Sequence, residues 1–161
     1  MDRPEPPWPQ ATQQDLLELM AGNEDAVKLV RDIVFWSHRY DDLVDGDPVT
    51  ADDVHRVMYK LLVALPMNPF YRQHEEMFRG VILTGVLDWL AANQMQASGE
   101  LEELRIAHVI RYSICGVAML AMTLTGGYEH AMKNARRCRL LSQYDTWDHY
   151  LSEHTREGTP C

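Results

Sequence analysis

The sequence predicts an all-α protein, a single-domain bundle of six or seven helices. Apolar residues recur at helical spacing almost throughout the chain beyond residue 11, and no stretch shows the strict alternation typical of a half-buried strand. Residues that favour helix N-caps precede several of these periodic stretches, and glycine or proline follows them. Short connections between such helices are typical of a bundle.

Capping residues locate the first two helices. Thr12 is a candidate N-cap for a short helix through Met20, because its hydroxyl can accept a hydrogen bond from an amide of the first turn. Asn23 is a candidate N-cap for a long helix over residues 24–45, after which Gly46 provides a stop signal. The long helix carries most of the candidate site residues.

The later helices follow from similar signals. Thr50 and Asp53 have the spacing of a capping box, and the helix that they open is expected to end before Pro66. Asn68 is expected to start a helix that continues through Gln96. The remaining helices are expected over residues 100–124, with a stop at Gly126-Gly127, and over residues 128–154, with a break near Tyr144.

The chain divides into three parts by composition. Residues 1–11 hold four of the eight prolines and almost no periodicity, so we expect an extended proline-rich arm. Residues 12–155 form the predicted helical domain, and residues 156–161 a polar tail. A length of 161 residues suits one domain with a substantial core.

Charge and composition restrict the function classes. A formal net charge of −9 argues against nonspecific binding to nucleic acid or to an anionic membrane. No apolar run reaches the roughly 18 residues of a membrane span, and the N-terminus lacks the features of a signal peptide. We therefore expect a cytoplasmic protein. The three cysteines are widely spaced and form no C-x-x-C pair, so we expect reduced thiols.

Acidic residues gather at the end of the long helix. At 3.6 residues per turn, His38, Asp41, Asp42 and Asp45 continue a face that begins with valines and Phe35, while the opposite face is also apolar. A helix covered on both sides directs this His-Asp group inward. Carboxylates near a helix C-terminus are unfavourable, by roughly 0.3–1 kcal/mol each, and are stabilised by a cation. Mg²⁺ suits such a group, with Mn²⁺ as a substitute, and the alternative is a solvated helix end with an ordinary acidic turn.

Other candidate residues lie on the later helices. Asp88 stands in an apolar stretch and needs a base, an arginine or a metal if it is buried, so either a structural or a catalytic role fits it. His108 is expected to be a satisfied core histidine, whereas Arg111 and Tyr112, on the same face, are candidates for binding an anion. The basic cluster around Arg136 and Arg137 is either an exposed helix face or a second anion-binding element.

The string Asp41-Asp42-Leu43-Val44-Asp45 resembles the DDxxD motif of class I isoprenoid and terpene synthases. In that all-helical family the motif binds Mg²⁺ ions that hold the substrate diphosphate, so the resemblance implies that Asp41, Asp42 and Asp45 are metal ligands. The family's second metal-binding motif has no recognisable equivalent, Asp145 and Asp148 being a poor substitute. The chain is also about half the usual length of the family's catalytic domain.

The size of the chain is similar to that of small all-α nucleoside triphosphate pyrophosphatases, which bind Mg²⁺ through helix-borne acids and work as oligomers. Their motifs, EExxE and ExxD, are matched here only in kind, by the aspartates and by Asp88 or Glu75-Glu76. Both resemblances imply metal-assisted diphosphate chemistry on a small molecule. A hydrolase also needs a base, for which His38 is the nearest candidate, with Asp88 as a second catalytic residue.

Two other interpretations remain. The register from Asp41 to Asp52 is partly that of an EF-hand calcium loop, but Leu43 occupies a ligand position and Asp52 replaces the bidentate glutamate. A non-enzymatic interaction protein is the second, because nine methionines and four tryptophans suit an adaptable helical interface with a protein partner or a homo-oligomer.

Overall fold

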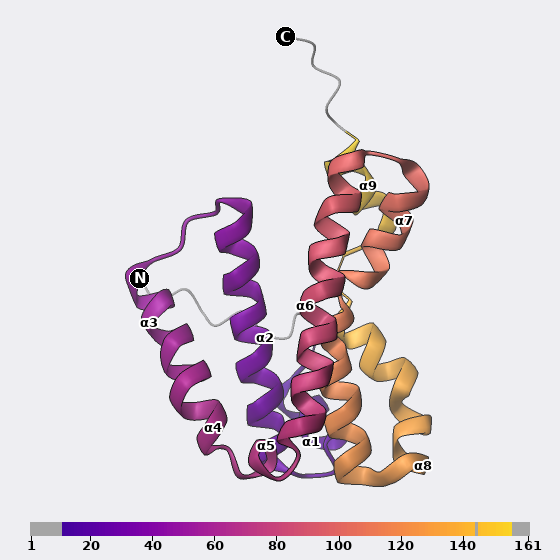
Figure 1. Cartoon of the computed structure of the whole chain (residues 1–161). Coiled ribbons are helices and arrows are strands. Elements are labelled where there is room, and N and C mark those ends of the chain that lie inside the picture. Colours follow the sequence, from indigo (N-terminus) through magenta and orange to yellow (C-terminus); the bar gives the residue numbers. More distant parts are fainter. Residues whose placement is uncertain (1–10, 144, 156–161) are drawn as a thin grey trace.

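The computed structural model describes residues 11–143 and 145–155, and these fold into helices joined by short connections, with no strand among them (Figure 1). The predicted all-α class is therefore confirmed. Of the expected arm over residues 1–11, residues 1–10 lie outside the described residues, as does the expected tail over residues 156–161.

Caps place the first two helices where the sequence predicts them. Helix α1 spans Gln13–Leu19 behind a capping box of Thr12 and Asp15. Helix α2 spans Glu24–Asp45, and the side chain of Asn23 accepts a hydrogen bond from the first turn. Gly46 ends α2 in the left-handed conformation, with φ 78°.

The next helix passes the proline at which it was expected to stop. Helix α3, Ala51–Tyr59, begins at the capping box of Thr50 and Asp53 and continues through a π turn, η1, Lys60–Ala64, into the short α4, Leu65–Met67. Pro66 lacks an amide hydrogen and its ring disturbs the preceding turn. The wider π turn just before it accommodates that disturbance, so the predicted stop before Pro66 is wrong.

Two long predicted helices are each divided. The stretch expected as one helix from Asn68 consists of α5, Pro69–Gln73, and α6, Glu75–Ser98, with non-helical backbone at His74 (φ −126°, ψ 21°). The stretch over residues 100–124 consists of α7, Leu101–Ile110, a 3₁₀ turn η2, Ser113–Cys115, and the start of α8, Gly116–Ser142.

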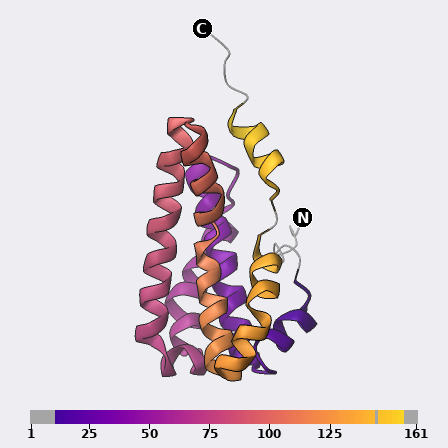
Figure 2. The ribbon, with the colours of Figure 1, turned by 90° about the vertical axis from the view of Figure 1, so that its right-hand side faces the viewer.

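The glycine stop and the last break are where the sequence places them. Gly127 has φ 79° and ψ 175°, and α8 folds back there into a second arm (Figures 1 and 2). Helix α9, Trp147–His154, follows after residue 144 and lies at the same end of the bundle as α7 (Figure 1). Figure 2 shows α1 beside the second arm of α8 at the opposite end.

Two apolar clusters hold the bundle together. The larger unites α1, the first half of α2, α5, the start of α6 and both arms of α8, with Leu19, Leu29, Phe78 and Met122 among its fully buried members. The smaller joins α6, α7 and α9 through Ala92, Leu104, Ala107 and Tyr150. The C-terminal end of α2 lies beyond the larger cluster, and Leu43 and Val44 there are exposed.

By length and composition, the stretch Leu101–His154 includes one segment apolar enough to cross a membrane. In the structure η2 and Gly127 divide this stretch, and part of it is buried in the bundle. Core helices of water-soluble proteins meet the same criterion, because they are apolar on every side. The expectation of a chain without a membrane span therefore stays a prediction.

Candidate functional site

A cavity lies between α2, α6 and the η2 turn. Aromatic and aliphatic side chains make up most of its wall, and the polar groups are few. It is lined by Val34, Trp36, Ser37, His38, Tyr40, Asp41, Gly85, Val86, Trp89, Arg111, Tyr112, Ile114, Cys115 and Ser142. The space open to the centres of water molecules is about 80 Å³. At roughly 10–15 Å³ for each water, it admits a group of about five to eight heavy atoms without rearrangement.

Glycines bring the walls of this cavity together. A methyl group on Gly85 of α6 would lie 3.1 Å from Cδ1, 3.2 Å from Cα and 3.3 Å from N of Ile114. Gly116 faces α6 in turn, and a methyl group there would lie 3.0 Å from Cγ1 of Val81. The η2 backbone therefore rests directly on α6, which places Arg111 and Cys115 beside α2.

Three aromatic rings form one side of the cavity. Trp36 and Tyr40 are one turn apart on α2 and their rings stack with centroids 5.8 Å apart. Tyr40 meets Trp89 of α6 at 5.0 Å. The indole Nε1–H of Trp89 donates to Oδ1 of Asp41 at 2.7 Å. An apolar wall thus ends at a fixed carboxylate.

Arg111 faces the same carboxylate. Its Nη2 lies 3.9 Å from Oδ2 of Asp41, and its side chain is 17% exposed. The guanidinium also lies over the rings of Tyr112 and Tyr150, at 5.9 and 5.5 Å from their centroids. These two cation–π contacts stabilise the positively charged Arg111 side chain in its position at the cavity. The structure therefore brings Arg111, Tyr112 and Asp41 together at one end of the cavity.

The three aspartates of the DDxxD string have different environments. Asp42 is paired with Arg39, whose Nη1 lies 2.5 Å from Oδ2, and Nε of Arg39 lies 3.9 Å from Asp53 of α3. Asp45 is exposed, and partial burial together with the charge of Asp41 raises its pKa. Asp41 and Asp45 are one turn apart, whereas Asp42 is neutralised by a buried arginine.

A preformed three-carboxylate metal site is not present at this helix end. Within residues 11–143 and 145–155, the group whose possible ligand atoms all lie within 4.8 Å of one another is Asp145, His149 and Glu153. There Nδ1 of His149 lies 2.8 Å from Asp145 and Nε2 lies 3.7 Å from Glu153. The histidine already bridges the two carboxylates, which accounts for the grouping without an ion.

The two candidate catalytic residues have different positions. His38 lines the cavity and is half-buried, and burial lowers its pKa although Asp41 and Asp42 oppose that shift. The neutral imidazole that results is the form a general base requires. Asp88 is half-buried and does not line the cavity, because the buried stripe of α6 runs through Phe78, Gly85 and Ala92 and places it at the edge. Asp88 therefore does not share this cavity with Asp41, and its catalytic role stays a prediction.

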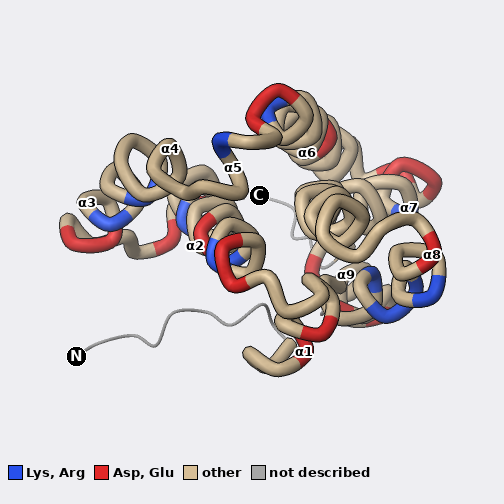
Figure 3. Tube along the Cα trace, turned by 90° about the horizontal axis from the view of Figure 1, so that it is seen from below, with Lys and Arg blue, Asp and Glu red and all other residues tan. Residues whose placement is uncertain are grey.

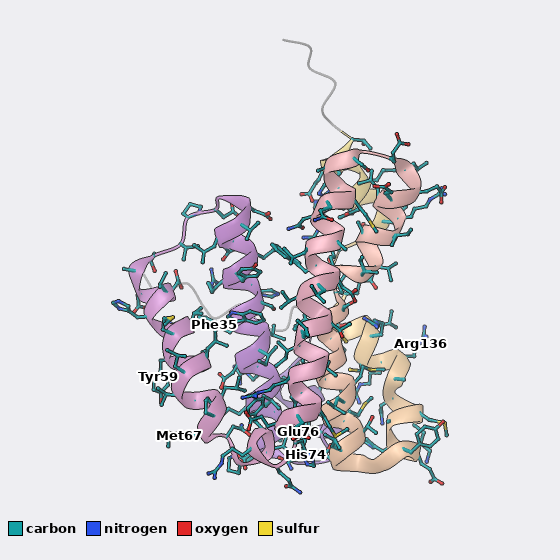
Figure 4. The ribbon with its side chains drawn as sticks, viewed as in Figure 1. Phe35, Tyr59, Met67, His74, Glu76 and Arg136 are labelled. Atoms are coloured by element: carbon teal, nitrogen blue, oxygen red, sulfur yellow. The ribbon has the colours of Figure 1, made fainter. Side chains whose placement is uncertain are left out.

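Arg136 and Arg137 of the basic cluster of α8 do not line the cavity. Arg137 binds α1, with Nη2 2.6 Å from Asp15 and 2.9 Å from Glu18. Arg136 is exposed on the outer side of the second arm of α8 (Figure 4). Figure 3 shows the Lys and Arg residues of α8 at the edge of the molecule. Of the two alternatives for this cluster, the exposed helix face fits Arg136, while Arg137 pairs with α1, because α8 reverses at Gly127.

Sequence reasoning missed several residues of the site. Of the aromatic wall formed by Trp36, Tyr40 and Trp89, the sequence indicates only the first two as neighbours, because they are spaced one helical turn apart. Arg39 was not singled out, although it is buried and pairs with Asp42. His108 is the buried core histidine that was expected, and its Nε2 lies 3.1 Å from the carbonyl of Asp145.

Comparison of the chain with protein-family models, with curated proteins and with solved structures finds no significant match.

Proposed function

We propose that the cavity binds a small molecule with a short apolar body and a diphosphate head group, together with Mg²⁺. The observation that carries this proposal is the position of the Asp41–Arg111 pair at the end of an aromatic cavity. An apolar group lies against Trp36, Tyr40 and Trp89, and the head group meets Arg111. The available space suits a group of about five carbon atoms, as in a short prenyl chain.

Asp41 and Asp45 are the residues that would hold the metal. Mg²⁺ is usually bound by one or two carboxylates, several waters and substrate phosphate oxygens, so two aspartates one turn apart suffice. The raised pKa of Asp45 agrees with this assignment, because partial burial and then the charge of Asp41 disfavour its carboxylate, and a cation would relieve the second of these effects. Bound Mg²⁺ would neutralise phosphate charge and orient the head group. Asp42 is left out of the proposed site because Arg39 already neutralises it.

The isoprenoid-synthase resemblance and the pyrophosphatase alternative predict different ligands for this cavity. The apolar wall, with Val34, Val86 and Ile114 beside the aromatic rings, favours an apolar body. A nucleobase is also able to stack on tryptophan or tyrosine, but it brings polar edges that need partners. We therefore place a prenyl-type diphosphate first and a nucleoside triphosphate second.

Titration calorimetry with Mg²⁺ tests the proposal, using inorganic pyrophosphate, a five-carbon prenyl diphosphate and a nonhydrolysable nucleoside triphosphate as separate ligands. We expect the prenyl diphosphate to bind most tightly and only with Mg²⁺ present. Asp41→Asn should weaken this binding at least tenfold while its amide oxygen still accepts the hydrogen bond from Trp89. Asp45→Asn should act similarly.

Two control variants sharpen this measurement. Asp52→Asn removes an exposed carboxylate that pairs with Arg56 of the same helix, and it should leave binding unchanged. Asp42→Asn should have a small effect, whereas a DDxxD site using all three aspartates predicts a loss as large as that of Asp41→Asn. Absence of binding by all three ligands in the presence of Mg²⁺ would refute the proposed function.

A second candidate function, self-association, is favoured by one face of α6. Each exposed residue of α6 from Gly80 to Ser98 is uncharged, and Leu83 and Leu87 are 59% and 56% exposed. A helix that is apolar on both its inner and outer faces is typical of one covered on both sides. Two copies that each carry a net charge of −9 repel one another, and this neutral face is where that repulsion is weakest. We therefore infer a second copy of the chain as its partner.

Light scattering after size exclusion tests the inference. We expect a dimer at tens of micromolar protein and a monomer for Leu83→Glu combined with Leu87→Glu. Leu140→Glu, at a residue of α8 that is 52% exposed, is the matched control and should leave the dimer intact. A monomeric unsubstituted chain at high concentration would contradict the inference.

A further inference from the structure

Two cysteines meet at the floor of the cavity. Cys115 lies on η2 and lines the cavity, and Cys138 lies on the second arm of α8. Their exposed fractions are 4% and 0%, and both are free thiols. The sequence predicts reduced thiols, because the three cysteines are widely spaced and form no C-x-x-C pair. The reversal of α8 at Gly127 is what brings them together.

The surroundings of the two thiols are polar on one side. The side chains of Cys115 and Cys138 are within hydrogen-bonding reach of each other, and a protonated Cys138 is the donor when Cys115 is a thiolate. The hydroxyl of Ser142 donates to the carbonyl of Arg139 at 2.8 Å and is also within hydrogen-bonding reach of Cys115. A hydroxyl rotates to suit its acceptor, so Ser142 is able to turn toward a thiolate. The guanidinium of Arg139 adds positive charge nearby.

These contacts distinguish the two sulfurs chemically. Donation from Cys138, with Ser142 and Arg139, lowers the pKa of Cys115 to about 7, against the effect of burial. The same contact and burial raise the pKa of Cys138. The thiolate is the nucleophilic form of cysteine, so at neutral pH a large fraction of Cys115 is reactive while Cys138 remains a thiol.

Access to Cys115 is through the cavity. The open space of about 80 Å³ exceeds what a molecule of hydrogen peroxide occupies, since a single water needs roughly 10–15 Å³. Bulky thiol reagents are excluded by the same dimensions. The cavity therefore selects small oxidants.

We propose that Cys115 and Cys138 form a peroxide-reactive dithiol in which Cys115 is the attacking sulfur and Cys138 the resolving one. The Cys115 thiolate attacks one oxygen of the peroxide, the O–O bond breaks, and hydroxide leaves, which gives a sulfenic acid on Cys115. The Cys138 sulfur then attacks that sulfur, and its proton leaves with the hydroxyl group as water. The product is a Cys115–Cys138 disulfide, with two electrons transferred from the thiols to the peroxide.

Peptide mapping by mass spectrometry tests the proposal in the full chain carrying Cys161→Ser, which removes the third thiol. After treatment with hydrogen peroxide we expect an intramolecular disulfide between the peptides holding Cys115 and Cys138. With stoichiometric oxidant, unmodified thiols at both positions, or a disulfide only between chains, would overturn the proposal.

A second substitution assigns the roles of the two sulfurs. Adding Cys138→Ser should stop the reaction at the sulfenic acid, which dimedone traps at Cys115 when the peroxide is removed and the chain is unfolded in its presence, whereas the chain with Cys115→Ser should give no adduct at Cys138. An adduct at Cys138 in that chain would overturn the assignment.

The pH dependence provides a readout that needs no substitution in the core. The rate at which iodoacetamide modifies Cys115 in the folded Cys161→Ser chain should rise with a midpoint near pH 7. A midpoint of 9 or above would contradict the proposed role of Cys115 as the attacking thiolate.

Discussion

Gly85 is the residue on which the close approach of η2 and α6 depends, and Gly85→Ala tests it. The new methyl group would meet Cα and N of Ile114 at 3.2 and 3.3 Å, so backbone, and not a flexible side chain, would have to move. Overpacking of this kind costs about 1–3 kcal/mol. Alanine in place of glycine inside a helix returns roughly 0.5–1 kcal/mol. We expect a net destabilisation of about 1–2 kcal/mol.

Gly80 provides the matched control for this substitution. It lies in the same helix, and a methyl group built there has no atom within 4 Å. Gly80→Ala should therefore stabilise the protein by about 0.5–1 kcal/mol through backbone entropy alone. Urea unfolding followed by circular dichroism measures both variants. Equal stability of Gly85→Ala and Gly80→Ala would refute the inference that η2 rests on α6 at Gly85.

Three further predictions concern charge and backbone geometry. Lys60→Met should destabilise the fold by about 2–3 kcal/mol, because it removes the cation that pairs with the buried Asp32. Arg79→Met, on the surface, should change the free energy of unfolding by less than about 0.5 kcal/mol. Urea unfolding measures both variants, and equal effects would contradict the prediction. Burial lowers the pKa of His38 below its usual 6.5, so the unfolded chain binds more protons below that pH. The contribution of His38 to stability is therefore complete above pH 6.5 and is lost as the pH falls through its folded-state pKa, and unfolding of His38→Gln should depend less on pH between 5 and 7. Gly127→Ala should cost about 1–3 kcal/mol in thermal or urea unfolding, because φ 79° and ψ 175° form a region that is nearly exclusive to glycine, and an unchanged midpoint would count against the reversal of α8.

Local sequence signals predicted the starts of the helices well. Thr12, Asn23 and Thr50 cap the helices expected of them, since capping depends on residues only two or three positions away. Breaks without such a signal were missed. The turn η2 follows Arg111 because the chain packs there against Gly85 of another helix, and periodicity within one segment does not report such a contact.

The same distinction explains the site. His38 and Asp41 were expected to face inward because they continue an apolar stripe of α2, and they line the cavity. Asp42 and Arg137 were predicted to bind a ligand. In the structure Asp42 pairs with Arg39, and Arg137 pairs with the two acids of α1. An ion pair across 122 positions, as between Arg137 and Asp15, has no counterpart in the local pattern. The charges in the sequence therefore indicated candidate ligand-binding residues. Which of these residues is already paired within the protein depends on contacts that only the fold reveals.

The proposed ligand site and the proposed dithiol share one cavity, and this predicts competition between them. Arg111 and Cys115 both line it, and the open space admits only about five to eight heavy atoms, so an apolar group seated beside Trp36 would exclude peroxide. Saturation with Mg²⁺ and the five-carbon prenyl diphosphate should slow formation of the Cys115–Cys138 disulfide at least tenfold, while Mg²⁺ with pyrophosphate, which lacks the apolar body, should slow it much less. Peptide mapping at timed intervals gives both rates. Calorimetry on the same samples shows whether the ligand binds. If the ligand binds without protecting Cys115, its apolar body lies outside the cavity. If the ligand does not bind and the disulfide still forms, the ligand site is refuted and the dithiol proposal stands.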